Sequence, residues 1–182
     1  GQSAVKADET IMLLSPKQAC YTGHASKHVV TLFFSDLGIT NYPKYGTKTS
    51  ELIKPNLFRI EKIPKLSHKG TNGSVLILGG WGNMLCAGFL AGLAAARTGV
   101  GKVFICTPNS KFRPMELIGI DPKLEDLKSC LKQVNVVVAG PGLNEKADEY
   151  LHLIWKSKLP LVLDAYGLRW LAQNNPPKRT TN

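Results

Sequence analysis

Short apolar segments that run directly into glycine, proline or aspartate are the feature that most limits how this chain can fold. Four of them lie in its second half, at residues 74–80, 102–107, 135–142 and 159–164. They are rich in valine, isoleucine and leucine and are too short to be buried helices, which is typical of strands buried on both faces of a parallel sheet. Parallel strands need crossover connections, so helices are expected between them.

Helical patterns occur where those crossovers are needed. Residues 86–97 are rich in alanine, and Gly99 follows them as an expected left-handed cap. Residues 123–134 and 144–156 each carry an apolar stripe, and a short helix is expected at 167–172. The second half of the chain is therefore predicted to be an α/β domain, with a mainly parallel sheet flanked by helices.

The first part of the chain differs from this pattern. Residues 1–40 contain two β-like runs, at 10–14 and 29–34, which predict a short β-rich segment. Residues 41–67 are polar and are interrupted by three prolines, which indicates a linker with a short helix near residues 50–53.

The charge balance is strongly basic. Lysine and arginine outnumber acidic residues by 23 to 13 in 182 residues, so the formal net charge is +10. The basic residues are spread along the chain without a run of four, and no nucleic-acid recognition motif accompanies them. The composition therefore favours a solvated basic face or a site for an anionic small molecule, and no nucleic-acid partner is expected.

Composition also bears on the compartment. No apolar run approaches the ~20 residues that span a bilayer, and no signal-peptide pattern opens the sequence, so no membrane partner is expected. The four cysteines form no CxxC pair, and three of them lie among apolar or helical residues, as buried free thiols of a cytoplasmic protein do. The opening at Gly1 reads like mid-chain sequence, which suggests a fragment or a processed chain.

The predicted strand ends form a candidate ligand site, because open parallel sheets bind ligands at the carboxyl ends of their strands. Gly80 and Gly82 follow the first strand, a Gly-Pro-Gly turn containing Gly142 follows the third, and Asp164 ends the fourth. Glycine lets backbone amides approach a phosphate closely, so Gly80 and Gly82 are candidate anion contacts. Tight turns would require the same glycines without any ligand.

Lys69 is a further candidate anion contact. It lies in a His-Lys-Gly-x-x-Gly stretch before the first strand, and the alternative is an ordinary turn into that strand. Two standard nucleotide motifs do not occur in the sequence, since it has neither a complete GxGxxG after a strand nor a Walker A lysine followed by serine or threonine. The four histidines suggest no catalytic triad.

Five motifs together resemble the ADP- or ATP-dependent NAD(P)H-hydrate dehydratase family. They are HKGTNGSVLILGG at residues 68–80, ARTGVG at 96–101, PMEL at 114–117, AGPGL at 139–143 and LVLDAYGL at 161–168. Upstream, AVKADET at residues 4–10 and DLGI at 36–39 resemble the last strands of the NAD(P)H-hydrate epimerase domain. The resemblance implies an epimerase-like tail at 1–40, a linker at 41–67 and, at 68–182, the front half of a ribokinase-like dehydratase domain.

The resemblance implies that the full-length protein is a multifunctional cytoplasmic enzyme that repairs hydrated nicotinamide cofactors. Its lyase activity would use ADP or ATP, with Mg²⁺, to dehydrate (6S)-NAD(P)H hydrate to NAD(P)H. Its isomerase activity would interconvert the R and S hydrates, with K⁺ in the epimerase part. Phosphorylation would turn the hydroxyl into a good leaving group. The partners would be anionic dinucleotides, and the full-length protein would be a homo-oligomer.

Three residues are candidate substrate contacts, and two of them, Ala87 and Gly142, match the family's substrate contacts by position. Ala87 and Gly142 would contact the substrate, so a larger side chain at Gly142 is expected to weaken substrate binding more than folding. Asp164 would orient substrate hydroxyls or a metal-bound water, with capping of the following helix as the alternative.

The chain departs from the family's pattern at four positions, and each change is expected to weaken substrate fit. Trp81 is bulkier than expected in the loop before the first helix, Cys86 replaces a glycine at the start of that helix, and Tyr166 replaces an aspartate. Asn144 replaces a glycine and is expected to act as a helix N-cap.

No catalytic residue is assigned within the chain. The resemblance places the dehydratase base, in a GTGD motif, beyond Asn182, and the epimerase aspartate before Gly1. Residues 1–182 alone are therefore expected to be inactive and to have an open sheet edge. Two other interpretations stay open, a catalytically inactive dinucleotide-binding or scaffolding protein and a small-molecule kinase of the ribokinase group.

Overall fold

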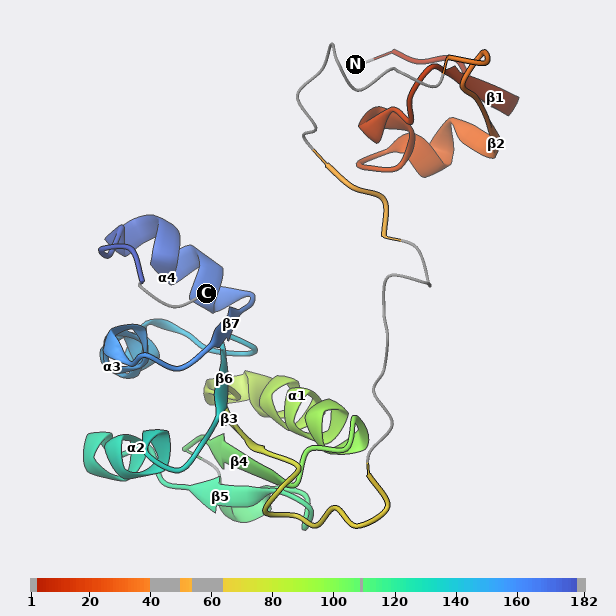
Figure 1. The fold of residues 1–182 in the computed structure, drawn as a ribbon. Coiled ribbons are helices and arrows are strands. Elements are labelled where there is room, and N and C mark those ends of the chain that lie inside the picture. Colours follow the sequence, from red (N-terminus) through yellow and green to blue (C-terminus); the bar gives the residue numbers. More distant parts are fainter. Residues whose placement is uncertain (1–2, 40–49, 54–63, 109, 180–182) are drawn as a thin grey trace. The chain divides into compact units, whose positions relative to one another are not determined.

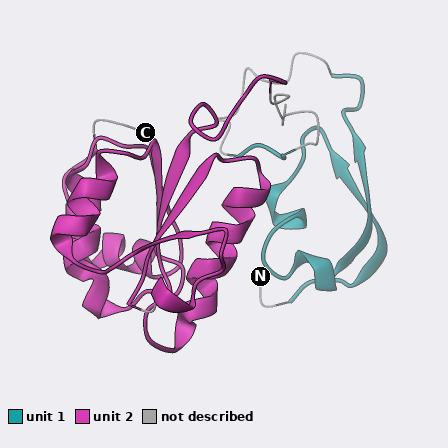
Figure 2. Ribbon diagram, turned by 90° about the horizontal axis from the view of Figure 1, so that it is seen from below, with its two compact units in different colours: residues 1–60 teal, residues 61–182 magenta. Residues whose placement is uncertain are grey.

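The computed structural model describes residues 3–39, 50–53, 64–108 and 110–179. They belong to two compact units, residues 1–60 and 61–182, which Figure 2 colours separately. Most of the expected linker at 41–67 lies outside the described residues. The short helix expected near residues 50–53 is wrong, because this segment has no regular structure. So short a segment closes at most one helical hydrogen bond, which does not offset the entropy lost in ordering its backbone.

The smaller unit contains one pair of parallel strands. β1 (Ala7–Leu13) pairs with β2 (Val29–Ser35), so both predicted strands form, with slightly shifted ends. Two 3-10 turns, η1 (Gln18–Cys20) and η2 (Ala25–Lys27), lie in the connection between them. Met12 is buried against this pair, whereas most of its other large apolar side chains are exposed.

The larger unit is built on a five-stranded parallel sheet with the order β5-β4-β3-β6-β7 (Figure 1). Its strands are β3 (Ser74–Leu78), β4 (Lys102–Cys106), β5 (Ile118–Ile120), β6 (Val136–Ala139) and β7 (Leu161–Leu163). All neighbouring strands pair in parallel. The predicted α/β class is therefore confirmed, and the first predicted strand of the domain, β3, lies at the centre of the sheet.

Helices cover both faces of this sheet. α1 (Leu85–Arg97) lies on one face, whereas α2 (Leu124–Leu131), α3 (Asp148–Lys156) and α4 (Tyr166–Asn174) lie on the other (Figure 1). All four correspond to predicted helices, and Gly99 follows α1 with a φ of +97°, as expected of a left-handed cap. Three 3-10 turns complete the unit: η5 (Gly82–Met84), η6 (Ser110–Phe112) and η7 (Glu145–Ala147).

Alternate residues of the central strands enter two separate cores. Val75 and Ile77 of β3 pack on the α1 side with Phe89. Leu76 and Leu78 of the same strand pack on the opposite side, where they join Leu127, Leu151, Ile154 and Trp170 from α2, α3 and α4. Burial on both faces explains why these strands are continuously apolar in sequence rather than alternating.

One strand was missing from the sequence-based prediction. β5 has only three residues and a glycine in the middle, Gly119, so it carries no periodic signal. It forms because its backbone pairs with β4, with Phe104 opposite Ile118 and Cys106 opposite Ile120. Residues 118–120 therefore form a strand because they pair with β4, and local propensity does not explain it.

Candidate functional site

Three loops meet where β3, β6 and β7 end, and we call residues 79–82, 140–142 and 164–167 the glycine rim. The strands are parallel neighbours, so their carboxyl ends share one edge of the sheet. Backbone hydrogen bonds join the loops: the Gly80 amide donates to the Pro141 carbonyl at 2.9 Å, and the Trp81 amide donates to the Gly142 carbonyl at 2.7 Å. The rim is thus one hydrogen-bonded unit at the predicted edge.

Glycine is required at this rim because the backbones touch. A Cβ on Gly142, whose φ is +63°, would lie 2.5 Å from the Met84 carbonyl oxygen and 3.0 Å from the Cβ of Ala87. A side chain on Gly140 would overlap the Asp164 carbonyl. The glycines therefore serve close packing between loops, in addition to any contact with a ligand.

The structure brings Ala87 and Gly142 together, as their shared assignment to a substrate site requires. A larger side chain at Gly142 was expected to weaken substrate binding more than folding, and the packing around this residue argues against that expectation. A larger side chain there would meet the Met84 backbone and would also need a left-handed φ, so it would disturb the rim itself. Gly142 is a packing residue first, and a substitution would alter folding together with binding.

Thr107 is a residue bonded to the rim that the sequence interpretation missed. It follows β4, is fully buried, and its hydroxyl donates to the Gly80 carbonyl at 2.7 Å. This bond attaches the loop after β4 to the rim. The available signal was a hydroxyl residue at a predicted strand end, where the other strand ends carry glycine or aspartate.

The three candidate anion contacts do not form one site. The Gly80 amide already donates a hydrogen bond to the Pro141 carbonyl. Gly82 is exposed, with a φ of +55°, where the chain turns into η5. Lys69 lies in the turn before β3, at the opposite end of that strand, roughly 15 Å away for a five-residue strand. Lys69 and the two glycines therefore lie at opposite ends of β3, and each stays a separate predicted anion contact.

Asp164 remains available for a ligand. Its side chain is exposed and makes no hydrogen bond within the part of the chain that the structure describes, while its backbone carbonyl accepts from the Gly167 amide at 2.8 Å. The N-cap residue of α4 is Ala165, and no side chain makes a capping hydrogen bond there, so capping is not what the Asp164 carboxylate does. Ala165 has φ +46° and ψ −116°, a strained conformation of the kind found at functional turns.

Two departures from the family's pattern have clear structural consequences. Trp81 is 5% exposed and packs edge-on against Tyr150 with the ring centroids 5.8 Å apart, so its bulk enters the core and does not crowd the rim as expected. The Asn144 side chain accepts from the Lys146 amide at 3.2 Å, which confirms its capping role at η7.

Tyr166 links the rim to α3. Its hydroxyl donates to the Asp148 carboxylate at 2.9 Å. Burial and this hydrogen bond raise the pKa of the Tyr166 phenol, so it stays protonated and can serve as the donor. The Tyr166 side chain therefore points toward the start of α3. At position 166 the family pattern has an aspartate instead.

The four cysteines are free thiols. Burial raises the pKa of Cys106 to about 12 and that of Cys130 to about 11, so both are protonated near neutral pH. Cys86 is exposed at the start of α1, contrary to the expectation that the helical cysteines are buried, because its side chain lies on the outer surface of that helix.

The described ranges also limit other kinds of site. Within them no helix has the length and apolar character to cross a bilayer. The same residues include no group of three or more His, Cys, Asp or Glu side chains placed to hold a metal ion.

Comparison with known proteins gives consistent matches. Residues 75–182 match the family model described as NAD(P)H-hydrate dehydratase. The bifunctional NAD(P)H-hydrate repair enzyme of Coxiella burnetii is 33% identical over 183 residues, covering 94% of this chain but 38% of that protein. The ADP-dependent (S)-NAD(P)H-hydrate dehydratase of Lactiplantibacillus plantarum is 32% identical over 145 residues, covering 74% of this chain and 51% of that protein. The chain thus spans about half or less of these relatives.

The fold has known structural neighbours. A ribokinase-like superfamily protein from Enterococcus faecalis superimposes with a TM-score of 0.59 at 22% identity, over 65% of this chain and 45% of that one. At this identity the likeness concerns the fold, and it confirms the ribokinase-like architecture of the larger unit.

Proposed function

The chain belongs to the NAD(P)H-hydrate dehydratase family, and from this membership we propose that its larger unit forms the front half of a site that dehydrates (6S)-NAD(P)H hydrate to NAD(P)H. The observation that carries the proposal is the glycine rim. It places Ala87, Gly142 and an unpartnered Asp164 carboxylate around one edge of the sheet, where parallel α/β folds bind ligands.

Each rim residue has a proposed role. Ala87 and Gly142 carry little or no side chain beside the start of α1, so the nicotinamide ring of the hydrate can approach the backbone there. Asp164 accepts hydrogen bonds from substrate hydroxyls, and a carboxylate is a stronger acceptor for them than a neutral group. Because the described residues hold no preformed metal cluster, Mg²⁺ would be carried by the phosphates of ADP or ATP, with Asp164 contacting its water shell.

The nucleotide phosphate supplies the chemistry of leaving-group activation in this family. The chain's own residues bind and orient the hydrate, but elimination also needs a base within hydrogen-bond reach. None of the residues we assign here is such a base, and the 182-residue sequence has no GTGD motif. We therefore propose that residues 1–182 bind the hydrate without turning it over.

The smaller unit fits a wider activity. We propose that residues 1–40 are the tail of an epimerase-like domain and residues 41–67 the linker to the dehydratase part. The full-length protein would then be a cytoplasmic homo-oligomer that couples epimerisation of the R and S hydrates, with K⁺ bound in the epimerase part, to dehydration. The basic composition, +10, suits such anionic dinucleotide and nucleotide partners.

Recovery of NADH absorbance from its hydrate tests the proposal. Residues 1–182 are expected to give no recovery with ADP or ATP, whereas the full-length protein recovers NADH with one of them. Recovery of NADH by residues 1–182 alone would overturn the proposal that they hold only the substrate-binding half of the site. A full-length protein that binds the hydrate but never restores NADH would instead be an inactive dinucleotide-binding protein. Nucleotide-dependent phosphorylation of an unrelated hydroxyl compound would support a ribokinase-group kinase.

A further inference from the structure

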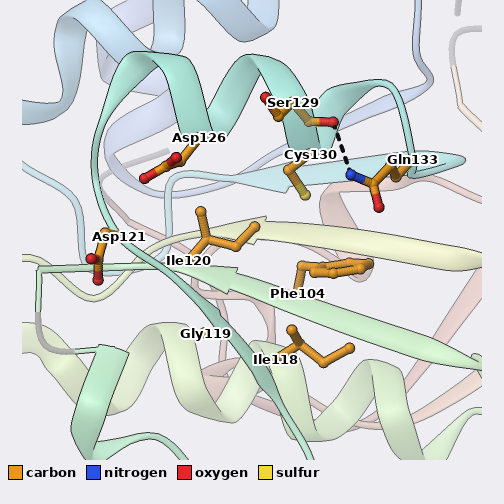
Figure 3. A pocket seen from close by; sticks show the side chains of 9 residues that line it. All are labelled: Phe104, Ile118, Gly119, Ile120, Asp121, Asp126, Ser129, Cys130 and Gln133. Atoms are coloured by element: carbon orange, nitrogen blue, oxygen red, sulfur yellow. Dashed lines mark hydrogen bonds between the residues drawn. The ribbon is translucent and has the colours of Figure 1, made fainter.

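A groove of about 410 Å³ runs beside the edge strand β5 and shares no residue with the glycine rim. Figure 3 shows its floor, formed by Phe104 of β4 and by Ile118 and Ile120 of β5, and its wall, formed by α2. The size lies in the range of ~300–1,000 Å³ that is usual for small-molecule sites. Its lining residues are Phe104, Ile118, Gly119, Ile120, Asp121, Asp126, Ser129, Cys130 and Gln133.

The floor is apolar because of the strand register. Phe104 is opposite Ile118, and Ile120 lies two residues further along the same face, so all three side chains face α2. Leu127 of α2 is fully buried, but Ile118 is 42% exposed, which shows that the helix leaves the β5 side of this face uncovered. A flat apolar body can therefore rest on Phe104 and Ile118.

The polar groups of the groove are acidic. Asp121 and Asp126 lie at the same end of it (Figure 3), and no lysine, arginine or histidine lines it. The Asp121 carboxylate accepts from the Ser110 hydroxyl at 3.1 Å. Within the described residues neither aspartate is paired with a basic side chain, although the chain as a whole carries a net charge of +10. Two unpaired carboxylates beside an apolar floor favour a cation.

One of the remaining groups, Gln133, also offers an acceptor to a hydrogen-bond donor. Cys130 is 4% exposed, its sulfur points into the groove (Figure 3), and its thiol has no hydrogen-bond partner in the described ranges. Gln133 donates its side-chain amide to the Ser129 carbonyl at 3.3 Å, so its own carbonyl oxygen is left as an acceptor. Acceptors thus lie at both ends of the groove.

We propose that this groove binds a small organic cation with a flat apolar body and an amidinium or guanidinium head. The head lies between Asp121 and Asp126, and the body rests on Phe104 and Ile118. The aromatic ring of Phe104 adds a favourable stacking interaction with a flat aromatic body. The inference does not depend on the proposed dehydratase function, because the two sites share no residue.

Benzamidine is the probe that tests this proposal, with benzamide as its neutral counterpart of nearly equal shape. Titration into residues 1–182, followed by amide chemical shifts, is expected to move signals of β5 and α2 with a dissociation constant of about 1 mM. Benzamide is expected to bind at least about ten-fold more weakly, because it cannot pair with the carboxylates.

Two matched variants locate the charge. Asp126→Asn is expected to weaken benzamidine binding about five-fold or more, whereas Glu125→Gln, the same change at the adjacent exposed residue of α2 outside the groove, leaves it unchanged. Ile118→Ser, in the floor, should also weaken it. Equal binding of benzamidine and benzamide, unchanged binding by Asp126→Asn with a native thermal transition, or no shifts at about 20 mM would each overturn the proposal.

Discussion

The carbonyl oxygen of Met84 lies 2.5 Å from the point where a Cβ on Gly142 would begin. The turn after β6 therefore passes directly against the residue that precedes α1, and the same contact places Ala87 beside that turn. Loops from two strands are thus packed into one surface, which fixes the position of the proposed substrate contacts. The order of this surface depends on the absence of a side chain at Gly142, as it also does at Gly140.

Gly142→Ala is expected to destabilise the larger unit by about 2 kcal/mol or more, because it combines a left-handed φ with a backbone collision. Gly82→Ala is the matched control. Gly82 has a similar φ of +55°, but its nearest neighbour is the Asn144 side-chain amide at 3.7 Å. The control should lose only about 1 kcal/mol. Urea unfolding measures both, and equal losses would show that the Met84 contact carries no cost.

Thr107→Val is expected to lower the free energy of unfolding by about 1–2 kcal/mol, since it removes the buried hydrogen bond to the Gly80 carbonyl while keeping the shape. Thr107→Ser keeps the hydroxyl and should rescue rim order, seen as native-like chemical shifts at Gly80 and Trp81. A valine variant with native stability and native rim shifts would contradict the role of Thr107 in holding the rim.

Alkylation should distinguish the exposed Cys86 from the buried Cys106 and Cys130 by their rates of reaction. At pH 8 Cys86 is expected to react with iodoacetamide within the native protein, because it is exposed. Cys106 and Cys130 should stay unmodified, because burial both blocks the reagent and raises their pKa to about 12 and about 11. Peptide mass spectrometry after a timed reaction measures this. Rapid native labelling of Cys106 would show that the core around it opens.

The same thiols give the stability a defined pH dependence. Their folded-state pKa values lie above the ordinary value of 9.0, so the folded state holds its protons more tightly. Stability is expected to be unaffected by these thiols below pH 9 and to fall as pH rises from about 9 toward 12, because the unfolded chain ionises first. A Cys106→Ala variant should show a smaller fall over that window when urea midpoints are compared.

The sequence predicted the elements whose signal is local. Continuous apolar runs identified β3, β4 and β6, which are buried on both faces, and also β7, whose Val162 is 55% exposed. Gly99 marked the end of α1. β5 escaped because three residues around Gly119 have no period, and only the pairing with β4 makes them a strand. The helix near residues 50–53 failed because so short a segment gains too few helical hydrogen bonds to offset the entropy lost in ordering its backbone.

The site was less predictable than the fold. Glycines at strand ends correctly indicated the rim, but sequence order could not show that the Gly80 amide is used by Pro141, or that Lys69 lies at the other end of β3. Trp81 was expected to weaken substrate fit because it is bulky, but its side chain lies in the core against Tyr150. Direction of a side chain depends on tertiary packing, which a single sequence does not report.

Asp164→Asn tests the proposed substrate role of the free carboxylate. The Asp164 side chain has no hydrogen bond in the described ranges, so the variant should keep its thermal transition. It should bind (6S)-NADH hydrate about ten-fold more weakly, because a charged acceptor is replaced by a neutral one. Glu149→Gln, an exposed acid in the first turn of α3 and outside the rim, is the matched control and should bind like the wild type.

Calorimetric titration of (6S)-NADH hydrate into residues 1–182 is the most direct test of the central claim that the glycine rim is half of a dehydratase substrate site. The account predicts saturable binding without release of NADH, and a loss of affinity in Asp164→Asn but not in Glu149→Gln. If the wild-type chain binds no hydrate even at a high hydrate concentration, or if all three proteins bind it equally well, the glycine rim is not a substrate site.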